Sequence, residues 1–309
     1  MTELHLSTPL LHSLPLSSLV RGQVWLKMEA LQPTGSFKIR GIGHACRTYI
    51  EQGATRLLSS SGGNAGLAVA FAGRKLAVPV TVVVPESTKK RAIDLIELEE
   101  AEVIIHGESW DEAHQHATAL CSDRDAYIHP FDDPLIWAGH ATVIDEIRSS
   151  GLHPDLLVVS IGGGGLFCGI VEGLRRNGFD LTSILAVETV GADSLSQSLQ
   201  AGKLVELEEI SSIATSLGAK KVAQRAFDYA QTDTVFSEVV DDRTAVASCE
   251  RFLEDHRVLV EPACGAALSV VYRQLDLLNQ FRTIAIIVCG GVGVTLDQLG
   301  KWKHEDTIS

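Results

Sequence analysis

Short apolar runs rich in β-branched residues alternate with longer segments of helical periodicity along this chain of 309 residues. The runs predict strands at Val24–Lys27, Arg56–Ser59, Val80–Val84, Glu102–Ile105, Leu156–Ser160, Ile184–Glu188 and Ile284–Cys289. Most are apolar nearly throughout, which is typical of parallel strands covered on both faces. Helical patterns lie between them, at Ala65–Ala77, Trp110–Cys121, Leu166–Asn177, Arg243–Glu254 and Ala266–Leu278. This alternation predicts an α/β fold whose ligand lies at the carboxyl ends of the strands.

The composition narrows the class of protein. Apolar residues make up 45% of the chain and charged residues 21%, which excludes a disordered protein. The net charge of −13 argues against a nucleic-acid partner, because phosphates require a basic face. The apolar runs are shorter than the roughly 20 residues of a membrane span, and the N-terminus lacks the pattern of a secretory signal. We therefore expect a cytoplasmic protein with no membrane partner and with reduced cysteines.

Four consecutive glycines, Gly162–Gly165, stand between the expected strand Leu156–Ser160 and a helix that starts at Leu166. Bare backbone N–H groups at the start of a helix are suited to binding an anion. The segment lacks the Lys-Ser/Thr ending of a P-loop and cannot be aligned with GxGxxG. We therefore expect a phosphate monoester here, and a tight turn without a ligand is the alternative.

The segment Pro33–Gly41 places a lysine near the start of a helix. Ser36 is the expected N-cap of a helix that runs through Tyr49, which puts Lys38 in the first turn. The helix macrodipole disfavours a positive charge there, and such a lysine is suited to imine formation. A solvated surface lysine is the alternative.

Two further turns follow expected strands. Ser59–Gly66 offers hydroxyls, an amide and N–H groups at a helix start, which suit a carboxylate ligand. An ordinary N-cap is the alternative reading of that turn. Val288–Gly293 contains Cys289, which is either part of a site or a small core residue.

Taken together, the lysine motif, the Ser59–Gly66 turn, the glycine run and the Cys289 turn resemble the fold-type II pyridoxal-phosphate enzymes, most closely the serine/threonine ammonia-lyases. The resemblance extends over essentially the whole chain. It implies a tryptophan synthase β-like α/β fold with two open domains, a cofactor in the cleft between them, and a homodimer. The large catalytic domain would comprise residues 1–34 and 138–309, with a small domain inserted at residues 35–137.

The resemblance also implies roles for single residues. Lys38 would bind pyridoxal 5'-phosphate and take the Cα proton, and Cys289 would face the pyridine nitrogen. Further cofactor contacts are implied for Phe37, Asn64, Gly162, Gly163, Gly164, Gly165 and Leu166. The substrate carboxylate would be held by Ser61, Gly62, Asn64 and Ala65. A monovalent cation, with potassium as the candidate, would be bound by oxygen ligands at Gly162, Glu188, Ala192, Ser194, Leu217 and Ala219.

The implied reaction is β-elimination of water from L-serine, which gives pyruvate and ammonia, with L-threonine giving 2-oxobutanoate. A serine racemase, a β-replacing enzyme of the cysteine synthase type and a non-catalytic cofactor-binding protein are the alternatives. Gly62 lacks the hydroxyl with which racemases protonate the face of Cα opposite the lysine, and this favours elimination. Ser216 stands where related enzymes often have alanine, and it leaves the preference between serine and threonine open.

Overall fold

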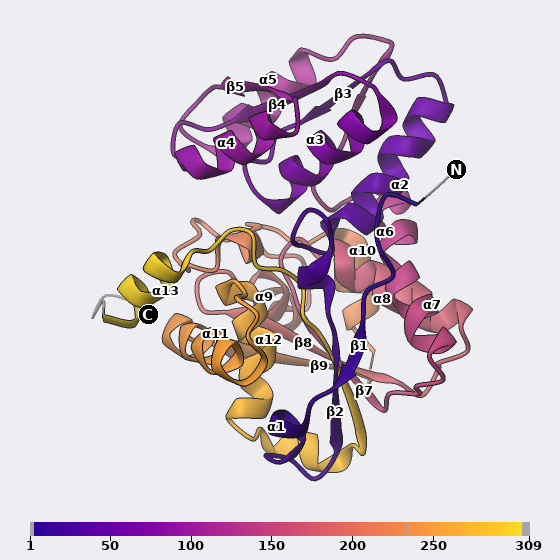
Figure 1. Ribbon diagram of the computed structural model, residues 1–309, viewed down its shortest axis with the longest axis vertical. Coiled ribbons are helices and arrows are strands. Elements are labelled where there is room, and N and C mark those ends of the chain that lie inside the picture. The colour runs from indigo at the N-terminus through magenta and orange to yellow at the C-terminus, as the bar shows by residue number, and fades with distance from the viewer. Residues whose placement is uncertain (1–2, 233, 305–309) are drawn as a thin grey trace. The chain divides into compact units, whose positions relative to one another are not determined.

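The computed structural model describes residues 3–232 and 234–304. The chain divides into two compact units (Figure 1). Unit 1 comprises Met1–Leu6 and Gln32–His140, and unit 2 comprises Ser7–Leu31 and Ala141–Ser309. Each unit combines helices with one sheet, so the predicted α/β class is confirmed. The domain boundaries that the resemblance implies, at 34/35 and 137/138, remain a prediction.

Unit 2 is built on a six-stranded sheet with the order β1-β2-β10-β7-β8-β9. Only β1 and β2 pair antiparallel, and the other neighbours are parallel. The central strands are buried nearly throughout, as parallel strands covered by helices must be. The strands are β1 (Leu10–His12), β2 (Gln23–Lys27), β7 (Leu156–Ser160), β8 (Ser183–Thr189), β9 (Val235–Val240) and β10 (Thr283–Ile287).

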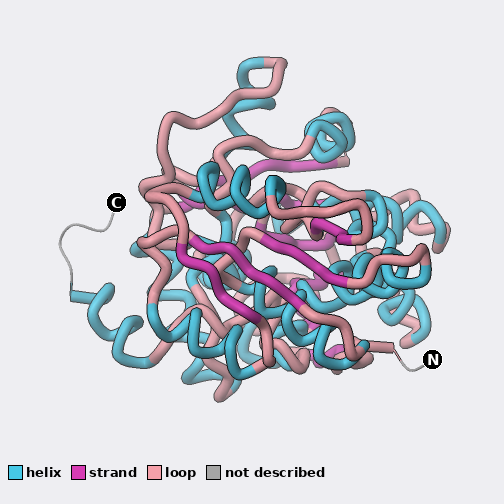
Figure 2. Tube along the Cα trace, turned by 90° about the horizontal axis from the view of Figure 1, so that it is seen from above, coloured by secondary structure: helices cyan, strands magenta, loops and turns pink. Residues whose placement is uncertain are grey.

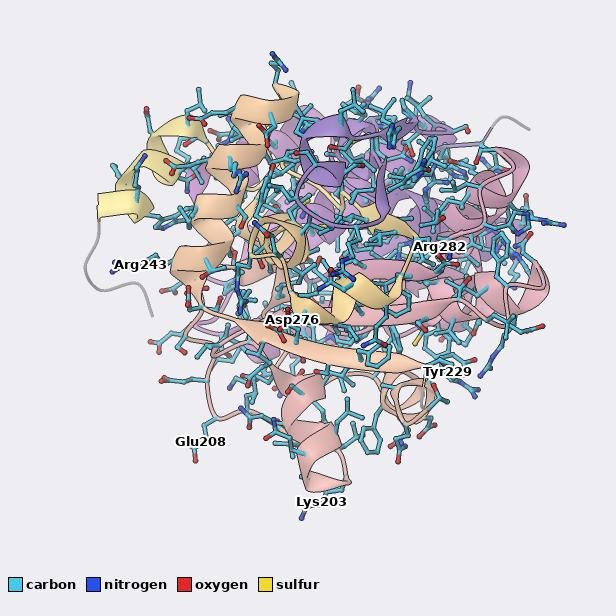
Figure 3. All side chains as sticks on the ribbon, turned by 90° about the horizontal axis from the view of Figure 1, so that it is seen from below. Lys203, Glu208, Tyr229, Arg243, Asp276 and Arg282 are labelled. Atoms are coloured by element: carbon cyan, nitrogen blue, oxygen red, sulfur yellow. The ribbon has the colours of Figure 1, made fainter. Side chains whose placement is uncertain are left out.

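Helices surround this sheet. Helix α12 contacts β7, β8 and β10 and packs along α11, while α7 packs on α8. Lys203, Glu208 and Arg243 are exposed at the surface of unit 2 (Figure 3). The helices are α1 (Leu14–Ser17), α7 (Thr142–Ser149), α8 (Gly165–Arg176), α9 (Ser194–Ala201), α10 (Gln224–Ala230), α11 (Asp242–His256), α12 (Pro262–Tyr272) and α13 (Leu296–His304), with 3-10 turns η1 (Glu29–Leu31), η2 (Thr215–Leu217) and η3 (Asp276–Gln280).

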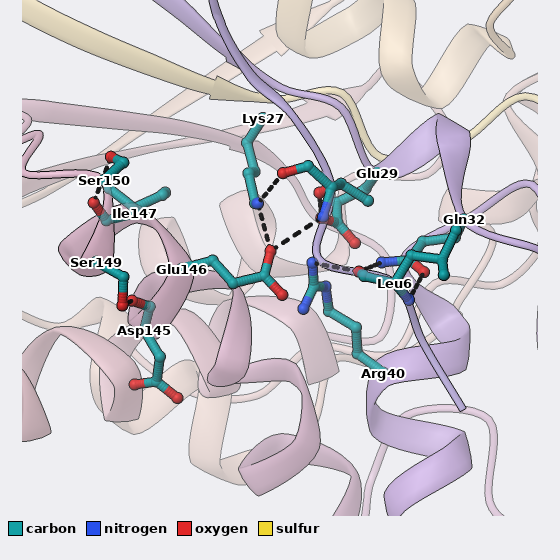
Figure 4. Close-up of polar contacts among 11 residues, drawn as sticks. Leu6, Lys27, Glu29, Gln32, Arg40, Asp145, Glu146, Ile147, Ser149 and Ser150 are labelled. Atoms are coloured by element: carbon teal, nitrogen blue, oxygen red, sulfur yellow. Dashed lines mark hydrogen bonds and ion pairs between the residues drawn. The ribbon is translucent and has the colours of Figure 1, made fainter. Parts of the chain in front are cut away.

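A buried ion pair joins the first strands of unit 2 to α7. The Lys27 ammonium pairs with Glu146 and donates to the carbonyl of Thr8 at 2.6 Å (Figure 4). The Thr8 hydroxyl donates to Glu29 at 2.5 Å. Because each of these groups is hydrogen-bonded, their burial is tolerated.

Unit 1 contains a four-stranded parallel sheet with the order β5-β4-β3-β6. Figure 2 shows strands flanked by helices. Helix α2 packs closely on α6. The closeness is visible at Gly41, where a Cβ would lie only 2.5 Å from the carbonyl oxygen of Ile136. The elements are α2 (Lys38–Glu51), β3 (Arg56–Ser59), α3 (Asn64–Leu76), β4 (Val80–Val84), α4 (Lys90–Leu98), β5 (Glu102–Ile105), α5 (Trp110–Ala119), β6 (Asp125–Tyr127) and α6 (Pro134–His140).

One predicted helix, Ala266–Leu278, was wrong in its bounds. The observed helix α12 begins at Pro262 and ends at Tyr272, and a separate 3-10 turn follows. Proline is favoured in the first helical turn because its missing N–H is not needed there, and Gln274 ends the helical path with a φ of 55°. Among the described residues, no helix is long and apolar enough to cross a membrane.

Candidate active site

The carboxyl ends of three adjacent parallel strands of unit 2 carry most of the predicted residues of that unit. The glycine run follows β7, Glu188 is the second-to-last residue of β8, and Cys289 follows β10. The Sγ atom of Cys289 lies 3.4 Å from the Oγ atom of Ser160, the last residue of β7. The structure therefore brings these motifs to one edge of the sheet, where ligands of open α/β sheets bind.

The glycine run has the features of a phosphate cradle. Gly164 precedes α8 with a φ of +89°, which favours glycine, and a Cβ there would lie 2.4 Å from the Cβ of Ala226. A Cβ at Gly162 would lie 3.1 Å from the Cα of Leu217. The N-cap of α8 is Gly164, which has no side chain to accept the first N–H groups of the helix, and N–H groups in that position suit an anion. These residues fit a cofactor that carries a phosphate.

In unit 1, Lys38 is the first residue of α2 and is half-buried. Its Nζ atom donates to the carbonyl of Pro130 at 2.6 Å and lies 5.2 Å from the centre of the Phe37 ring. The predicted N-cap, Ser36, was wrong: Phe37 occupies that position, and the buried Oγ of Ser36 has no hydrogen bond. The reason is that Phe37 already has helical dihedral angles, so Ser36 lies one residue too early to cap the first turn.

Several buried polar atoms of unit 1 have no hydrogen-bond partner. Among them are the hydroxyls of Thr34, Ser36 and Ser59 and the Nε2 atom of His140. Buried polar groups are normally satisfied, so such atoms are typical of a site that binds a further group. Nδ1 of His140 accepts from the N–H of Gly41 at 3.2 Å. Burial, then the charge of Lys38, lowers the pKa of His140, so the ring is neutral and its proton is on Nε2.

The turn after β3 is tightly built. A Cβ at Gly66 would lie 1.8 Å from the carbonyl oxygen of Ser61, so only glycine fits there. Helix α3 begins at Asn64, and the residue before it, Gly63, has no side chain with which to cap the helix. Ser61 is half-buried, and its Oγ accepts from the N–H of Gly63 at 3.4 Å. Hydroxyl and helix-start N–H groups are thus together in one turn, as a carboxylate ligand would require.

His129 is a candidate residue that sequence reasoning missed. Its Nδ1 accepts the backbone N–H groups of Phe131 at 3.2 Å and Asp132 at 2.8 Å. Burial, followed by the charges of His114 and Lys38, lowers its pKa to about 4, although Asp133 acts in the opposite direction. His129 is therefore a neutral ring close enough to Lys38 to sense its charge. The only signal in the sequence was its place directly before Pro130.

Glu188, predicted to bind a cation, caps the start of α9. Its two carboxylate oxygens accept the N–H groups of Leu195 at 2.9 Å and Ser196 at 2.8 Å. Burial raises its pKa to about 8, and the two N–H groups oppose this rise. Within the described residues, no three His, Cys, Asp or Glu side chains are grouped for a metal. Any cation here would depend on one carboxylate and on carbonyl oxygens.

Three of the other predicted cation ligands, Gly162, Ala192 and Leu217, lie close together. Ala192 and Leu217 belong to one buried cluster, and Leu217 lies next to Gly162. Ser194 is the buried first residue of α9. The N–H of Ala219 donates to the carbonyl of Leu217 at 2.7 Å, which leaves that oxygen a second lone pair.

Comparisons with protein families, named proteins and solved structures find proteins similar to this chain. The family described as pyridoxal-phosphate dependent enzyme matches residues 1–290. The human protein named L-serine dehydratase/L-threonine deaminase is 45% identical, with 98% of this chain and 95% of that protein covered. A solved fungal L-serine ammonia-lyase from Rhizomucor miehei superposes with a TM-score of 0.94 at 34% identity, covering 98% of this chain and 99% of that one. Maize serine racemase gives a TM-score of 0.87 at 27% identity, with 97% and 93% covered.

Proposed function

The chain belongs to the pyridoxal-phosphate-dependent enzymes, and from this premise we propose that it is an L-serine ammonia-lyase. It would convert L-serine to pyruvate and ammonia by β-elimination of water, and L-threonine to 2-oxobutanoate. One observation carries the proposal. Lys38 begins α2 with its amine hydrogen-bonded to Pro130, in the same unit as the Ser61–Asn64 turn.

The residues that would hold the cofactor follow from the site. We assign its phosphate to the N–H groups of the glycine run and of Leu166, and its ring to Phe37, Asn64 and Cys289. Lys38 would attach it covalently. The substrate carboxylate would be bound by Ser61, Gly62, Asn64 and Ala65. When bound, pyridoxal phosphate supplies an electron sink that makes the Cα–H bond of an attached amino acid acidic.

The chain's own groups would then guide the proton and the substrate. The Lys38 amine would take the Cα proton, and the Pro130 carbonyl would hold that amine in place. The Ser61–Asn64 turn would fix the carboxylate and so orient the Cα–H bond toward Lys38. The β-hydroxyl would leave as water by taking up one proton, which balances the proton that Lys38 removed from Cα, and hydrolysis of the released enamine would take up one water and free ammonia.

The test is to incubate the purified protein with L-serine and measure pyruvate and ammonia. We expect equal amounts of both, with 2-oxobutanoate formed from L-threonine. Chiral chromatography of a reaction stopped early should find little D-serine. Accumulation of D-serine before pyruvate would replace the proposal with a racemase, and cysteine formation on adding sulfide would indicate a β-replacing enzyme.

Gly62 lies close to the side chain of Thr88. A Cβ at Gly62 would lie 2.6 Å from Cγ2 of Thr88, so a serine needs Thr88 to move. The matched pair of variants is therefore Gly62→Ser alone and Gly62→Ser with Thr88→Ala. We expect the double variant to raise D-serine from a negligible level, because it adds a hydroxyl without the collision. An unchanged level in a folded double variant would contradict the role given to this position.

For the cation, we propose potassium at Glu188 and the neighbouring carbonyls of Gly162, Ala192, Leu217 and Ala219, with Ser194 beside them. The support is that a buried carboxylate is stabilised in its charged form by a hard cation. Activity should be higher in potassium chloride than in choline chloride at equal ionic strength. Equal activities would remove the cation from the proposal.

A further inference from the structure

The hydroxyl of Tyr127 links the turn after β3 to helix α5. Its Oη atom lies 2.6 Å from the Oγ atom of Ser60 and 2.7 Å from the Nδ1 atom of His114. Ser60 directly precedes Ser61, the first residue of the turn to which we assign the substrate carboxylate. The link therefore ends beside a proposed substrate residue, although none of the three linked side chains has a role in the proposed reaction.

The pairing of β3 with β6 brings Tyr127 to Ser60. The two strands are parallel neighbours, with Leu58 opposite Tyr127 and the N–H of Ile128 donating to the carbonyl of Leu58 at 2.7 Å. Ser60 stands two residues after Leu58, and side chains two residues apart along a strand share a face. Because Tyr127 is the last residue of β6, the sheet fixes its backbone, and its hydroxyl meets the chain where β3 passes into the turn.

Ser60 is completely buried, so its hydroxyl is not open to a ligand from solvent. An effect of Ser60 on a bound carboxylate must therefore pass through its neighbour Ser61, which is half-buried. A buried hydroxyl without a partner is costly, and Tyr127 supplies a partner from the neighbouring strand. The bond thus favours the position of Ser60 in which this hydroxyl is satisfied, and the turn starts from that position.

Aromatic side chains hold the other side of Tyr127. The His114 and Tyr127 rings meet edge to face with their centres 5.1 Å apart. The Trp110 indole stacks on His114 at 4.9 Å with an angle of 6° between the rings. His129 lies edge-on to Tyr127 at 6.4 Å. Aromatic pairs favour these separations, so the Tyr127 ring is held by side chains as well as by the sheet.

The direction of both hydrogen bonds follows from the chemistry of the three groups. Burial raises the pKa of Tyr127 to about 12, although the Ser60 hydrogen bond opposes this rise, so the phenol keeps its one hydrogen. A phenol is a stronger donor than an aliphatic hydroxyl, and the bare nitrogen of a neutral imidazole is a stronger acceptor than a hydroxyl oxygen. While His114 is neutral, Tyr127 therefore donates to its Nδ1 atom, and Ser60 donates to the Oη of Tyr127.

We propose that Tyr127 is a positioning residue for the substrate carboxylate. Its hydroxyl takes the hydrogen of Ser60 and so fixes the start of the Ser61–Asn64 turn on β6. Because the hydrogen of Ser60 is used inside the unit, the carboxylate is left to the Ser61 hydroxyl and to the N–H groups of the turn. This role rests on the proposed function, which assigns the carboxylate to this turn.

The experiment compares KM and kcat for L-serine in the loaded enzyme with Tyr127→Phe, Ser60→Ala and both changes together. Each single variant should raise KM about three- to tenfold, as the loss of one neutral hydrogen bond does. The fall in kcat should be smaller, because carboxylate contacts exist both before and in the transition state. The double variant should raise KM no more than the larger single effect, since both changes remove the same bond.

Tyr49→Phe is the matched control. It removes a tyrosine hydroxyl of the same unit that donates to Asp133 at 2.7 Å, and it should keep the wild-type KM. If Tyr127→Phe does not fold, Ser60→Ala decides, because it removes the same bond from the other side.

Nuclear magnetic resonance of the cofactor-free protein tests the link without any reaction. In neutral His114, Nδ1 should carry no hydrogen, and its resonance should shift in Tyr127→Phe because the nitrogen loses its donor. The backbone N–H resonances of Ser61–Asn64 should shift in Tyr127→Phe and in Ser60→Ala, and Tyr49→Phe should leave them in place.

Additive effects of the two single variants on KM, or turn resonances that stay in place in both, would overturn the proposed role of Tyr127. A hydrogen on Nδ1 of neutral His114 would overturn the direction assigned to the Ser60 hydroxyl. Shifted turn resonances in a protein that does not deaminate L-serine would sink the proposed function and leave the hold of Tyr127 on the turn. Deamination with an unchanged KM in both single variants would sink the role of Tyr127 only.

Discussion

Lys38 begins a helix, as the exposed Lys90 also does, but Lys38 is half-buried and its amine is fixed on the Pro130 carbonyl at 2.6 Å. Lys38→Ala should abolish the visible, borohydride-reducible band of the bound cofactor. Loss of the base alone should lower kcat/KM by about 10²–10⁴-fold. Lys90→Ala, at the exposed start of α4, is the control and should behave as wild type. A band that persists in Lys38→Ala would show that another lysine binds the cofactor.

The lowered pKa of His129 predicts that the folded protein loses stability in acid. Its pKa is lowered from 6.5 to about 4 in the folded protein, so the unfolded chain binds more protons between these values. Its contribution to stability is complete above 6.5 and is lost as the pH falls toward 4. Between pH 7 and pH 5 this loss is about 2 kcal/mol. The buried His140 acts in the same direction, so the variant must isolate His129.

The measurement is urea unfolding of wild type and His129→Gln at pH 7 and pH 5. The variant should lose about 2 kcal/mol less than wild type over this range, because glutamine does not titrate. His153→Gln, at an exposed position, is the control and should keep the wild-type pH dependence. Identical slopes for His129→Gln and wild type would mean that His129 is not held neutral.

At the scale of elements, the start of α8 decides whether the glycine run can hold a phosphate. Gly164→Val forces a side chain into a φ of +89° and toward Ala226 at 2.4 Å. Gly178→Val is the matched control, because Gly178 has a φ of +69° and no neighbour within 4 Å of its Cβ. The control should cost about 1–2 kcal/mol of stability from the dihedral angle alone, and Gly164→Val should cost more.

The same pair tests the phosphate role. We expect Gly164→Val to bind pyridoxal phosphate weakly in an equilibrium titration, while Gly178→Val binds it as wild type does. Circular dichroism should show that both variants keep their helices. Wild-type affinity in Gly164→Val would mean that the phosphate is held elsewhere.

The elements that sequence patterns could predict are those with continuous apolar runs. The bounds of β3, β4, β5 and β7 are as predicted, because a polar residue, a proline or a glycine stands within two positions of each end. The strands β1, β6 and β9 were missed, since they are short or only half-buried and show no such run. Their places depend on pairing with distant strands, which local pattern does not encode.

Local sequence patterns are limited in the same way when they are used to predict the site. The glycine run and Lys38 were found because unusual residues stand at a helix start, where backbone N–H groups impose their chemistry. His129 was missed because its neutral state comes from burial and from the charges of His114 and Lys38, residues distant in sequence. The contact between Ser160 and Cys289 depends on β7 and β10 being neighbours, although 129 positions separate the two residues.

For the whole molecule, the proposed cofactor residues come from both units. Lys38 and Asn64 belong to unit 1, while the glycine run and Cys289 belong to unit 2. A ligand that binds only the folded state stabilises the segments that hold it, and hydrogen exchange reports this segment by segment. Adding pyridoxal phosphate should therefore slow exchange both at the start of α3 and at the start of α8.

Mass spectrometry of the exchanged protein, with and without the cofactor, makes this prediction measurable. Helix α4, which carries no proposed cofactor residue, is the internal control and should exchange alike in both states. In Lys38→Ala the phosphate alone would still be recognised, so protection should persist at the start of α8 and weaken at the start of α3. Protection confined to one unit in the wild type would contradict the assignment of cofactor residues to both, because a ligand held by both sets of groups must stabilise both.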